Sequence, residues 1–335
     1  MSEILKNKIK HFSQLEKEWN YLQKKINLNN NITEKKNCPI CGNKKKLKII
    51  FKKKGLNFVK CNCNNSNHIF INPAIKSKIL DNHFKKSQSW KTWAKKVLIK
   101  KIKDKSENQK FSDSIKKIKQ FKKKKICNVL DIGCSTGNFL RYCKKNFKWK
   151  LYGIEPSYES FKVARKYCDK DISLTNCNLN NFKTNQKFDL ITFWASLEYI
   201  QDINKAFKKV KKIANKDSII LIFVSGNSNS LIMRTLREKC IGFVFNRTHY
   251  FNPTSLKMFA SKHGFKELFK KSYYTELDIL ENYYNYNDPY DRTKNKKNQK
   301  VIDKKLSNLF CKIIDEKKMG YKFLAIFRKN KKNYI

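Results

Sequence analysis

An acid and two glycines interrupt an apolar run in the segment VLDIGCSTGNFL, residues 129–140. The run favours a buried strand that ends at Asp131, and Gly133 and Gly137 permit a sharp turn into a following helix. A close backbone approach and the free N–H groups of a helix N-terminus are typical of a nucleotide site. A second apolar run, LYGIE, ends in Glu155, the place of an acid that holds ribose hydroxyls.

The spacing of these residues argues against a dinucleotide ligand. The dinucleotide pattern G-x-G-x-x-G requires glycine at two positions where this chain has Ser135 and Asn138. The pattern here is D-x-G-x-x-x-G, and the carboxylate of Asp131 repels phosphate. We therefore expect a ligand that is positively charged or rich in donors. S-adenosylmethionine (SAM) fits, because it has a ribose, an amino group and a sulfonium but no phosphate.

Short apolar runs alternate with helical stretches from Ile126 onward, a pattern that indicates a parallel sheet covered on both faces. Five segments in this region resemble, in order, the motifs of the class I SAM-dependent methyltransferase family. They are VLDIGCSTGNFL, LYGIEPS, CNLNNF, FDLITFWASLEYIQDI and HYFNPTSLKMFASKHGF. The resemblance implies an α/β fold with a Rossmann-like, doubly wound, mostly parallel sheet, and an enzyme that transfers the methyl group of SAM.

The same resemblance implies a set of cofactor-binding residues. Asp131, Gly133 and Gly137 are expected to shape the methionine end of the site, and Glu155 to take the ribose diol. Asn178, where the family more often has aspartate, is expected to face the adenine amine. The predicted set is completed by residues beside the cofactor, namely Cys134, Ser135 and Trp194.

Candidates for a general base follow the fourth and fifth apolar runs. Methyl transfer from a sulfonium is an in-line displacement that needs alignment and exclusion of water, and an oxygen nucleophile also benefits from a base. His249 lies in a segment that resembles the acceptor-facing region and is our first candidate; packing against its aromatic neighbours is the alternative. Tyr199, where many relatives have histidine, is the second. Glu198 is interpreted as a helix-start acid, or alternatively as a base.

Four of the eleven cysteines cluster near the N-terminus, at 38, 41, 61 and 63. Two pairs of closely spaced thiolates can hold one tetrahedral Zn²⁺, which with four protein ligands would be structural. CPICG and HIFINP resemble the two ends of a module that precedes some sugar C-methyltransferase-like proteins. In that alignment the last ligand falls on Ser66, which is not a zinc ligand. Either Cys61 or His68 then completes the set, with Cys61 preferred; a knuckle that has lost its metal is the alternative. The predicted metal ligands are thus Cys38, Cys41, Cys61 and Cys63, with His68 as the alternative fourth.

The chain divides by pattern into four parts. Residues 1–37 predict an amphipathic helix and a linker, and residues 38–73 the cysteine-rich module. Residues 74–125 predict a helical connector, and residues 126–335 the SAM-binding domain, with a Tyr/Asn-rich insertion at 273–300.

The formal net charge of +49 invites a nucleic-acid interpretation, because basic surfaces attract phosphate. Arginine, however, occurs at only seven positions, and lysine is spread over the whole chain with asparagine and isoleucine. This amino-acid composition resembles the codon bias of an AT-rich genome more than selection for a binding surface. No apolar run reaches the length of a membrane span and no signal peptide is visible, so we expect a soluble, cytoplasmic protein.

Two segments are placed to build an acceptor pocket, residues 225–250 and 273–292. Their tyrosines and asparagines suit a sugar or nucleotide sugar, so we predict a small-molecule acceptor, most consistent with a sugar or surface-polysaccharide precursor. An RNA base methyltransferase with a zinc module is the alternative, although FWAS stands where an amine-methylating NPPY-like tetrapeptide is expected. A non-catalytic, zinc-containing nucleic-acid-binding protein is a further alternative.

Overall fold

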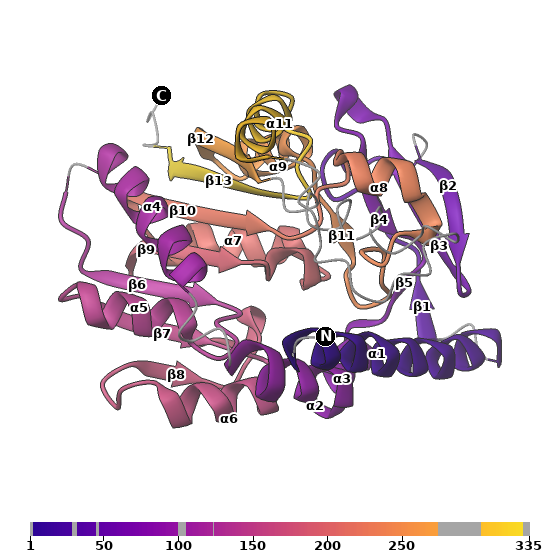
Figure 1. The fold of residues 1–335 in the computed structure, drawn as a ribbon, viewed down its shortest axis with the longest axis horizontal. Helices are drawn as coiled ribbons and strands as arrows, with labels where there is room; N and C mark the ends of the chain where they lie inside the picture. Colours follow the sequence, from indigo (N-terminus) through magenta and orange to yellow (C-terminus); the bar gives the residue numbers. More distant parts are fainter. Residues whose placement is uncertain are drawn as a thin grey trace.

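The computed structural model describes residues 3–28, 32–44, 47–99, 105–122, 124–273 and 303–330. Most of the Tyr/Asn-rich insertion predicted at 273–300, and with it one of the two acceptor segments, lies outside these residues. Figure 1 shows a large sheet flanked by helices and a smaller sheet beside it. Within the described ranges no helix is both long and apolar enough to cross a membrane.

The large sheet has seven strands and is mostly parallel (Figure 1). β6 pairs in parallel with β7 and β9, β9 with β10, and β7 with β8, whereas β13 runs antiparallel to β10 and β12. In sheet order the strands are β12 (Phe265–Tyr273), β13 (Lys322–Lys329), β10 (Ala214–Val224), β9 (Phe188–Trp194), β6 (Asn128–Ile132), β7 (Lys150–Ile154) and β8 (Ser173–Thr175). The strand order reverses at β6, where open α/β sheets bind their ligands.

Helices cover both faces of this sheet. One apolar core joins the sheet to two helices, α7 (Ile203–Ile213) and α9 (Pro253–Lys262), through side chains such as Phe207 and Phe259. A second core on the other face joins it to α4 (Lys105–Phe121) and α5 (Asn138–Asn146). The predicted doubly wound, Rossmann-like fold is therefore confirmed. Among the described residues, α6 (Tyr158–Tyr167) and α11 (Lys304–Glu316) also pack against this sheet, whereas α8 (Leu231–Leu236) lies beside the smaller sheet (Figure 1).

The smaller sheet is antiparallel and has four strands, in the order β11 (His249–Tyr250), β4 (His68–Ile71), β3 (Leu56–Cys61) and β2 (Leu47–Lys53). β11 pairs with β4, so a segment that follows the fifth parallel strand extends the sheet of the cysteine-rich region. A third core behind this sheet contains Phe58, Phe243 and Tyr250. Residues 38–73 are therefore joined to the rest of the molecule by backbone hydrogen bonds.

The N-terminal helix α1 (Glu3–Leu28) buries Leu15, Trp19 and Leu22, which belong to the third core. It packs against α3 (Gln88–Thr92) and the π-helical turn η3 (Trp93–Leu98), which follow α2 (Ser77–Lys86). Figure 1 shows α1, α2 and α3 lying together at one side of the large sheet. Two short strands, β1 (Thr33–Glu34) and β5 (Ala74–Ile75), pair antiparallel at the base of this group.

Candidate active site

The turn after β6 has the backbone that its sequence predicts. Gly133 and Gly137 adopt φ of 73° and 76°, the left-handed region that favours glycine. A Cβ on Gly133 would lie 2.5 Å from the Cβ of Ser196, and one on Gly137 would collide with the Sγ of Cys168. Gly137 then serves as the N-cap of α5. The two glycines therefore let the chain turn from strand to helix in close contact with the loop after β9.

Two buried carboxyl groups stand at the ends of neighbouring strands. Asp131 accepts a hydrogen bond of 2.8 Å from Thr192 Oγ1, and burial raises its pKa to about 7. Glu155 accepts bonds of 2.8 Å from the backbone N–H groups of Ser135 and Ser157, and burial raises its pKa to about 7 as well. A carboxylate has about four lone pairs, so Glu155 keeps acceptor capacity for a ligand diol.

A large cavity of about 970 Å³ lies at the carboxyl ends of β7, β6, β9 and β10; we call it the main cavity. This volume is at the upper end of the range for ligand sites, about 300–1,000 Å³. Of the residues predicted to bind the cofactor, Gly137 does not line this cavity and shapes the turn behind it. The predicted residues that do line it are Asp131, Gly133, Cys134, Ser135, Glu155, Asn178 and Trp194.

An acid that the sequence did not reveal stands beside Asn178. The Asn178 side chain accepts a hydrogen bond from the backbone N–H of Asn181 and is also bonded to the carboxyl of Asp81. Asp81 comes from α2 and lines the main cavity, and burial raises the pKa of its carboxyl. A carboxyl is thus present beside Asn178, the residue that the family resemblance predicts to face the adenine amine. Only the docking of α2 brings it there.

Trp194 forms an aromatic wall of the main cavity. Its ring lies 4.9 Å from that of Phe111, 5.2 Å from that of Phe139 and 5.8 Å from that of Phe223, measured between centroids. Its buried Nε1 has no hydrogen-bond partner. The residue is therefore at once part of the apolar core and a cavity-lining group, the two interpretations that its position at the end of β9 allows.

The structure argues against His249 as a base that faces the acceptor. His249 is buried in β11 and is not among the residues that line the main cavity. Its Nε2 donates to the carbonyl of Gln201 over 3.0 Å, and its Nδ1 lies 3.5 Å from Nε2 of His68. Burial lowers its pKa to about 4. The ring therefore holds two parts of the chain together, because the pairing of β11 with β4 turns it toward the cysteine-rich sheet.

Tyr199, the second predicted base, does line the main cavity. It belongs to the short helix η6 (Leu197–Tyr199) and accepts a hydrogen bond of 3.2 Å from Arg247 Nη2. Glu198, in contrast, is fully buried behind the cavity and accepts bonds of 3.0 and 2.9 Å from the N–H and Oγ of Ser225. Its role is to fix the loop after β10 rather than to cap a helix alone.

Arg247 and Tyr321 are cavity residues that the sequence analysis did not select. Arg247 is only 6% exposed, although arginine is usually a surface residue. The sequence does contain one signal for Arg247. Arginine is rare in this chain, with seven in all, and this one stands in the largely apolar segment IGFVFNRTHYF. Tyr321 gave no signal, since it reaches the cavity only because β13 runs antiparallel to β10.

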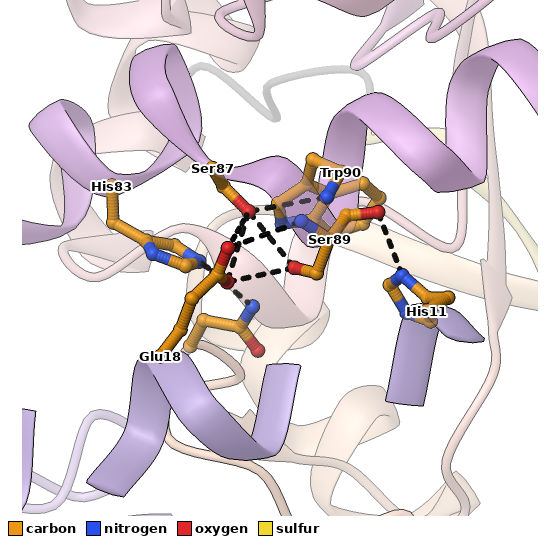
Figure 2. Close-up of polar contacts among 7 residues, drawn as sticks. His11, Glu18, His83, Ser87, Ser89 and Trp90 are labelled. Carbon is orange, nitrogen blue, oxygen red and sulfur yellow. Dashed lines mark hydrogen bonds and ion pairs between the residues drawn. The ribbon is translucent and has the colours of Figure 1, made fainter. Parts of the chain in front are cut away.

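Helices α1 to α3 roof the main cavity and are fastened by one carboxylate. Figure 2 shows Glu18 of α1 accepting hydrogen bonds from the hydroxyls of Ser87 and Ser89 and from the N–H of Ser89, over 2.8–3.1 Å. His83 Nε2 lies 3.8 Å from the same carboxylate (Figure 2). On α1 itself, His11 bonds the carbonyl of Ser89 and lines the cavity.

The four predicted cysteine ligands converge in space. The Sγ atoms of Cys38, Cys41, Cys61 and Cys63 all lie within 4.8 Å of one another, and those of Cys41 and Cys61 are 3.7 Å apart. Tetrahedral zinc with bonds of about 2.3 Å requires sulfur separations of about 3.8 Å, so the donor set fits the ion. Cys61 rather than His68 is the fourth member of this cluster.

The residues around the cluster explain why Cys61, and not His68, is its fourth member. Ser66, which aligns with the missing ligand, lies 3.1 Å from Cys63 Sγ through its Oγ and bonds the carbonyl of Cys61. His68 points instead to His249, as described above. Burial raises the pKa of Cys38, and it raises the pKa of Cys61 to about 11. Metal binding would therefore have to displace protons from these thiols.

Residues 95–268, more than half of the chain, match the model of a methyltransferase domain. The chain belongs to this family. Its sheet order, with one antiparallel strand inserted beside β10, is that of the class I methyltransferase fold.

Several proteins are similar to this methyltransferase-family chain. An uncharacterized protein of Methanocaldococcus jannaschii is 32% identical over 197 residues, which cover 58% of this chain and 77% of that protein. The 23S rRNA (cytidine-2'-O)-methyltransferase TlyA of Campylobacter jejuni is 31% identical over 94 residues, 28% of this chain and 36% of that enzyme. A solved structure of the plantazolicin methyltransferase BpumL covers 76% of this chain and 98% of its own, at 15% identity and a TM-score of 0.47.

The chain spans about a third of the length of the first curated relatives it matches. The match to the rRNA methyltransferase covers only 28% of this chain, so the acceptor is inferred from the chain's own cavity.

Proposed function

We propose that the protein binds SAM in the main cavity and transfers its methyl group to a second ligand in the same cavity. The observation that carries the proposal is the turn after β6, whose glycines and buried acids line a cavity of about 970 Å³ in a chain of the methyltransferase family. Bound SAM supplies an activated methyl group. The protein's own task is then to align the acceptor and exclude water.

The proposed cofactor contacts follow from the chemistry of the lining residues. Glu155 would accept from the ribose diol, and Asp131 would face the cationic methionine part. Asp81 with Asn178 would accept from the adenine amine. These three carboxyl groups all line the main cavity, and we call this part its acid end. Burial raises the pKa of each of them, so a ligand with donors or positive charge would favour their ionised form.

We propose a small molecule as the methyl acceptor, such as a sugar or a surface-polysaccharide precursor. The roof of α1 to α3 supports this, because residues such as His11, Asp81 and Trp90 close over the cavity. Tyrosine and tryptophan side chains suit a sugar ring through stacking and hydroxyl contacts. Of the two residues predicted to be catalytic, Tyr199 lines the cavity and His249 does not, so we propose that the Tyr199 hydroxyl contacts the acceptor.

Methylation of RNA is the second candidate function. It is favoured by the similarity to an rRNA methyltransferase over 94 residues and by the net charge of +49. The roof argues against it, because a nucleotide within a strand would have to pass α1 to α3 to reach the turn after β6.

We also propose that the four-cysteine cluster holds one structural Zn²⁺. Four sulfur ligands leave no open position for catalysis, and the ion would stabilise the sheet that carries β11. Metal analysis of the purified protein should give about one zinc per chain. A chain that is folded and contains no zinc would contradict this proposal and support a knuckle that has lost its metal.

The proposed activity is tested in two steps. Calorimetric titration with S-adenosylhomocysteine (SAH) should show one site per chain, and Glu155→Gln should weaken it. Transfer of label from SAM is then measured against nucleotide sugars and total RNA side by side. Label in RNA alone would favour the second candidate. Absence of SAH binding would reject both and leave a non-catalytic protein.

A further inference from the structure

Arg247 places a buried positive charge in the wall of the main cavity, on a segment that contributes none of the residues of the acid end. It lies beside the loops after β9 and β10, through Tyr199 and Ser225 respectively. Its Nη1 donates to the carbonyl of Gly242 over 3.2 Å, and its Nη2 donates to the hydroxyls of Tyr199 and Ser225 over 3.2 and 3.1 Å. All of these acceptors are neutral.

The guanidinium has donor capacity left over. Its Nε is buried and has no hydrogen-bond partner among the described residues. The nearest acid behind it, Glu198, is linked to it through Ser225, which bonds to both. A buried cation with an unused donor is costly unless a further group completes its hydrogen bonding. Because Arg247 lines the main cavity, a ligand there can supply such a group.

The surroundings of Arg247 select for negative charge. Tyr321 lies against the guanidinium and brings a second phenol to this end of the cavity. Lys239 and Lys322 line the cavity as well. Acids also line it, namely Asp81, Glu107, Asp131, Glu155 and Asp202, but the hydrogen bonds of the Arg247 guanidinium go to neutral groups. We call the part of the cavity formed by Tyr199, Ser225, Arg247 and Tyr321 its arginine end, and its charge suits an anion.

Two glycines reserve the space that this arrangement needs. A Cβ on Gly226 would collide with Nη1 of Arg247, and a Cβ on Gly242 would lie 2.5 Å from the hydroxyl of Tyr321. Neither glycine has a positive φ, so their small size and not their backbone freedom is what the site uses. The two glycines therefore leave the room that the Arg247 guanidinium and the Tyr321 hydroxyl occupy.

We propose that the arginine end is an oxyanion subsite, which binds a carboxylate or phosphate group on the methyl acceptor. Arg247 supplies the charge and its free donor, and the Tyr199 and Tyr321 hydroxyls supply neutral donors. The proposal deepens the proposed function and rests on it: the acceptor is an acidic small molecule whose oxyanion is held here while its nucleophile faces the cofactor.

The test is a calorimetric titration of the full chain with inorganic phosphate and, separately, with acetate, each with and without saturating SAH at constant ionic strength. Wild type should bind at least one of the two anions saturably. Arg247→Gln should weaken that binding at least about tenfold, the effect of losing one charge-assisted bond worth about 1.5–3 kcal/mol. The affinity for SAH should change less than about twofold. Whichever of phosphate and acetate binds more tightly identifies the class of oxyanion that the subsite prefers.

Two further variants keep the test decisive. Gly226→Ala displaces the guanidinium without removing any charge, and should weaken anion binding in the same direction even if Arg247→Gln does not fold. Arg234→Gln, an exposed residue of α8 outside the cavity, removes the same charge and should leave anion binding unchanged. Equal anion binding in wild type and Gly226→Ala, or no saturable binding of either anion to wild type, would overturn the subsite. Anion binding that depends on Arg247 in a protein that does not bind SAH would instead reject the proposed function and leave the subsite standing.

Discussion

At the acid end of the main cavity, Asp131, Gly133 and Glu155 come from two adjacent strands and one turn, and Asp81 alone is added by α2. At the arginine end, Tyr199, Arg247 and Tyr321 come from three separate segments that meet only in the folded chain. The acid end is held by backbone geometry, with two left-handed glycines and amide donors on Glu155. The arginine end is held by side chains. We infer that the acid end binds the cofactor, which the family shares. The arginine end binds the methyl acceptor, which is particular to this chain.

The largest loss of SAH affinity should come from a substitution in the backbone turn of the acid end. Gly133→Ala forces a Cβ against Ser196 in a left-handed conformation, so the turn must move. We expect SAH affinity to fall at least about 100-fold, or about 2.7 kcal/mol. Gly55→Ala is the matched control, because Gly55 also has positive φ but lies in the β2–β3 hairpin with its nearest side-chain atom 3.5 Å away. Both variants carry a strain of about 1–3 kcal/mol; equal SAH affinity in the two would contradict the assignment.

The next effect is a pH dependence at the same end. Glu155 has a pKa of about 7 in the folded protein and must be ionised to accept from a ribose diol. SAH binding should therefore weaken as the pH falls below about 7, by about tenfold per unit for one required deprotonation. Calorimetry between pH 5.5 and 8.5 measures this slope, and Glu155→Gln should reduce it to the part that comes from Asp131, whose pKa is also about 7. A wild-type slope that is flat would show that the carboxylate is not the group that binds.

The stability of the ligand-free protein should respond in the opposite direction. Because the pKa of Glu155 is raised on folding, the folded state keeps a proton that the unfolded chain releases above about pH 4.3. This group's contribution to stability is thus present at low pH and is lost as the pH rises through about 7. The difference in free energy of unfolding between wild type and Glu155→Gln isolates it from the buried histidines, whose lowered pKa values act with the reverse sign.

A smaller effect is expected at the arginine end. Tyr199→Phe removes a hydroxyl that bonds Arg247 and faces the cavity, but leaves the acid end unchanged. Turnover should fall about five- to tenfold, the effect of one hydrogen bond of about 1–1.5 kcal/mol, with SAH affinity within about twofold. Loss of SAH affinity in this variant would erase the distinction between the two ends. Tyr158→Phe, at an exposed position on α6, is the control.

The smallest catalytic effect should belong to His249. Its ring bonds Gln201 and approaches His68 away from the main cavity. His249→Ala should lower the free energy of unfolding by about 1–3 kcal/mol and leave turnover per folded chain within about twofold. Thermal unfolding and a transfer assay on the same preparation separate the two. A collapse of turnover in a stably folded variant would restore His249 as the base.

These contrasts explain what the sequence could and could not predict. The fold, and the part of the acid end that holds Asp131 and Glu155, could be predicted because strand, acid, glycine and helix follow one another locally, and left-handed turns require particular residues. The thiol cluster could be predicted from the spacing of its cysteines. The contributions of Asp81 and Tyr321 to the cavity could not be predicted, because they depend on the docking of α2 and the antiparallel insertion of β13, which are tertiary events. The position of His249 next to the cysteine-rich sheet could not be predicted either, because no local pattern reveals that β11 pairs with β4.

The most direct test of the account is a crystal structure of the protein with SAH bound. We expect the ribose of SAH against Glu155, its adenine near Asp81 and Asn178, and its sulfur directed toward Tyr199 and Arg247. SAH bound elsewhere, or with its sulfur turned away from the arginine end, would contradict the proposal that one cavity brings cofactor and acceptor together.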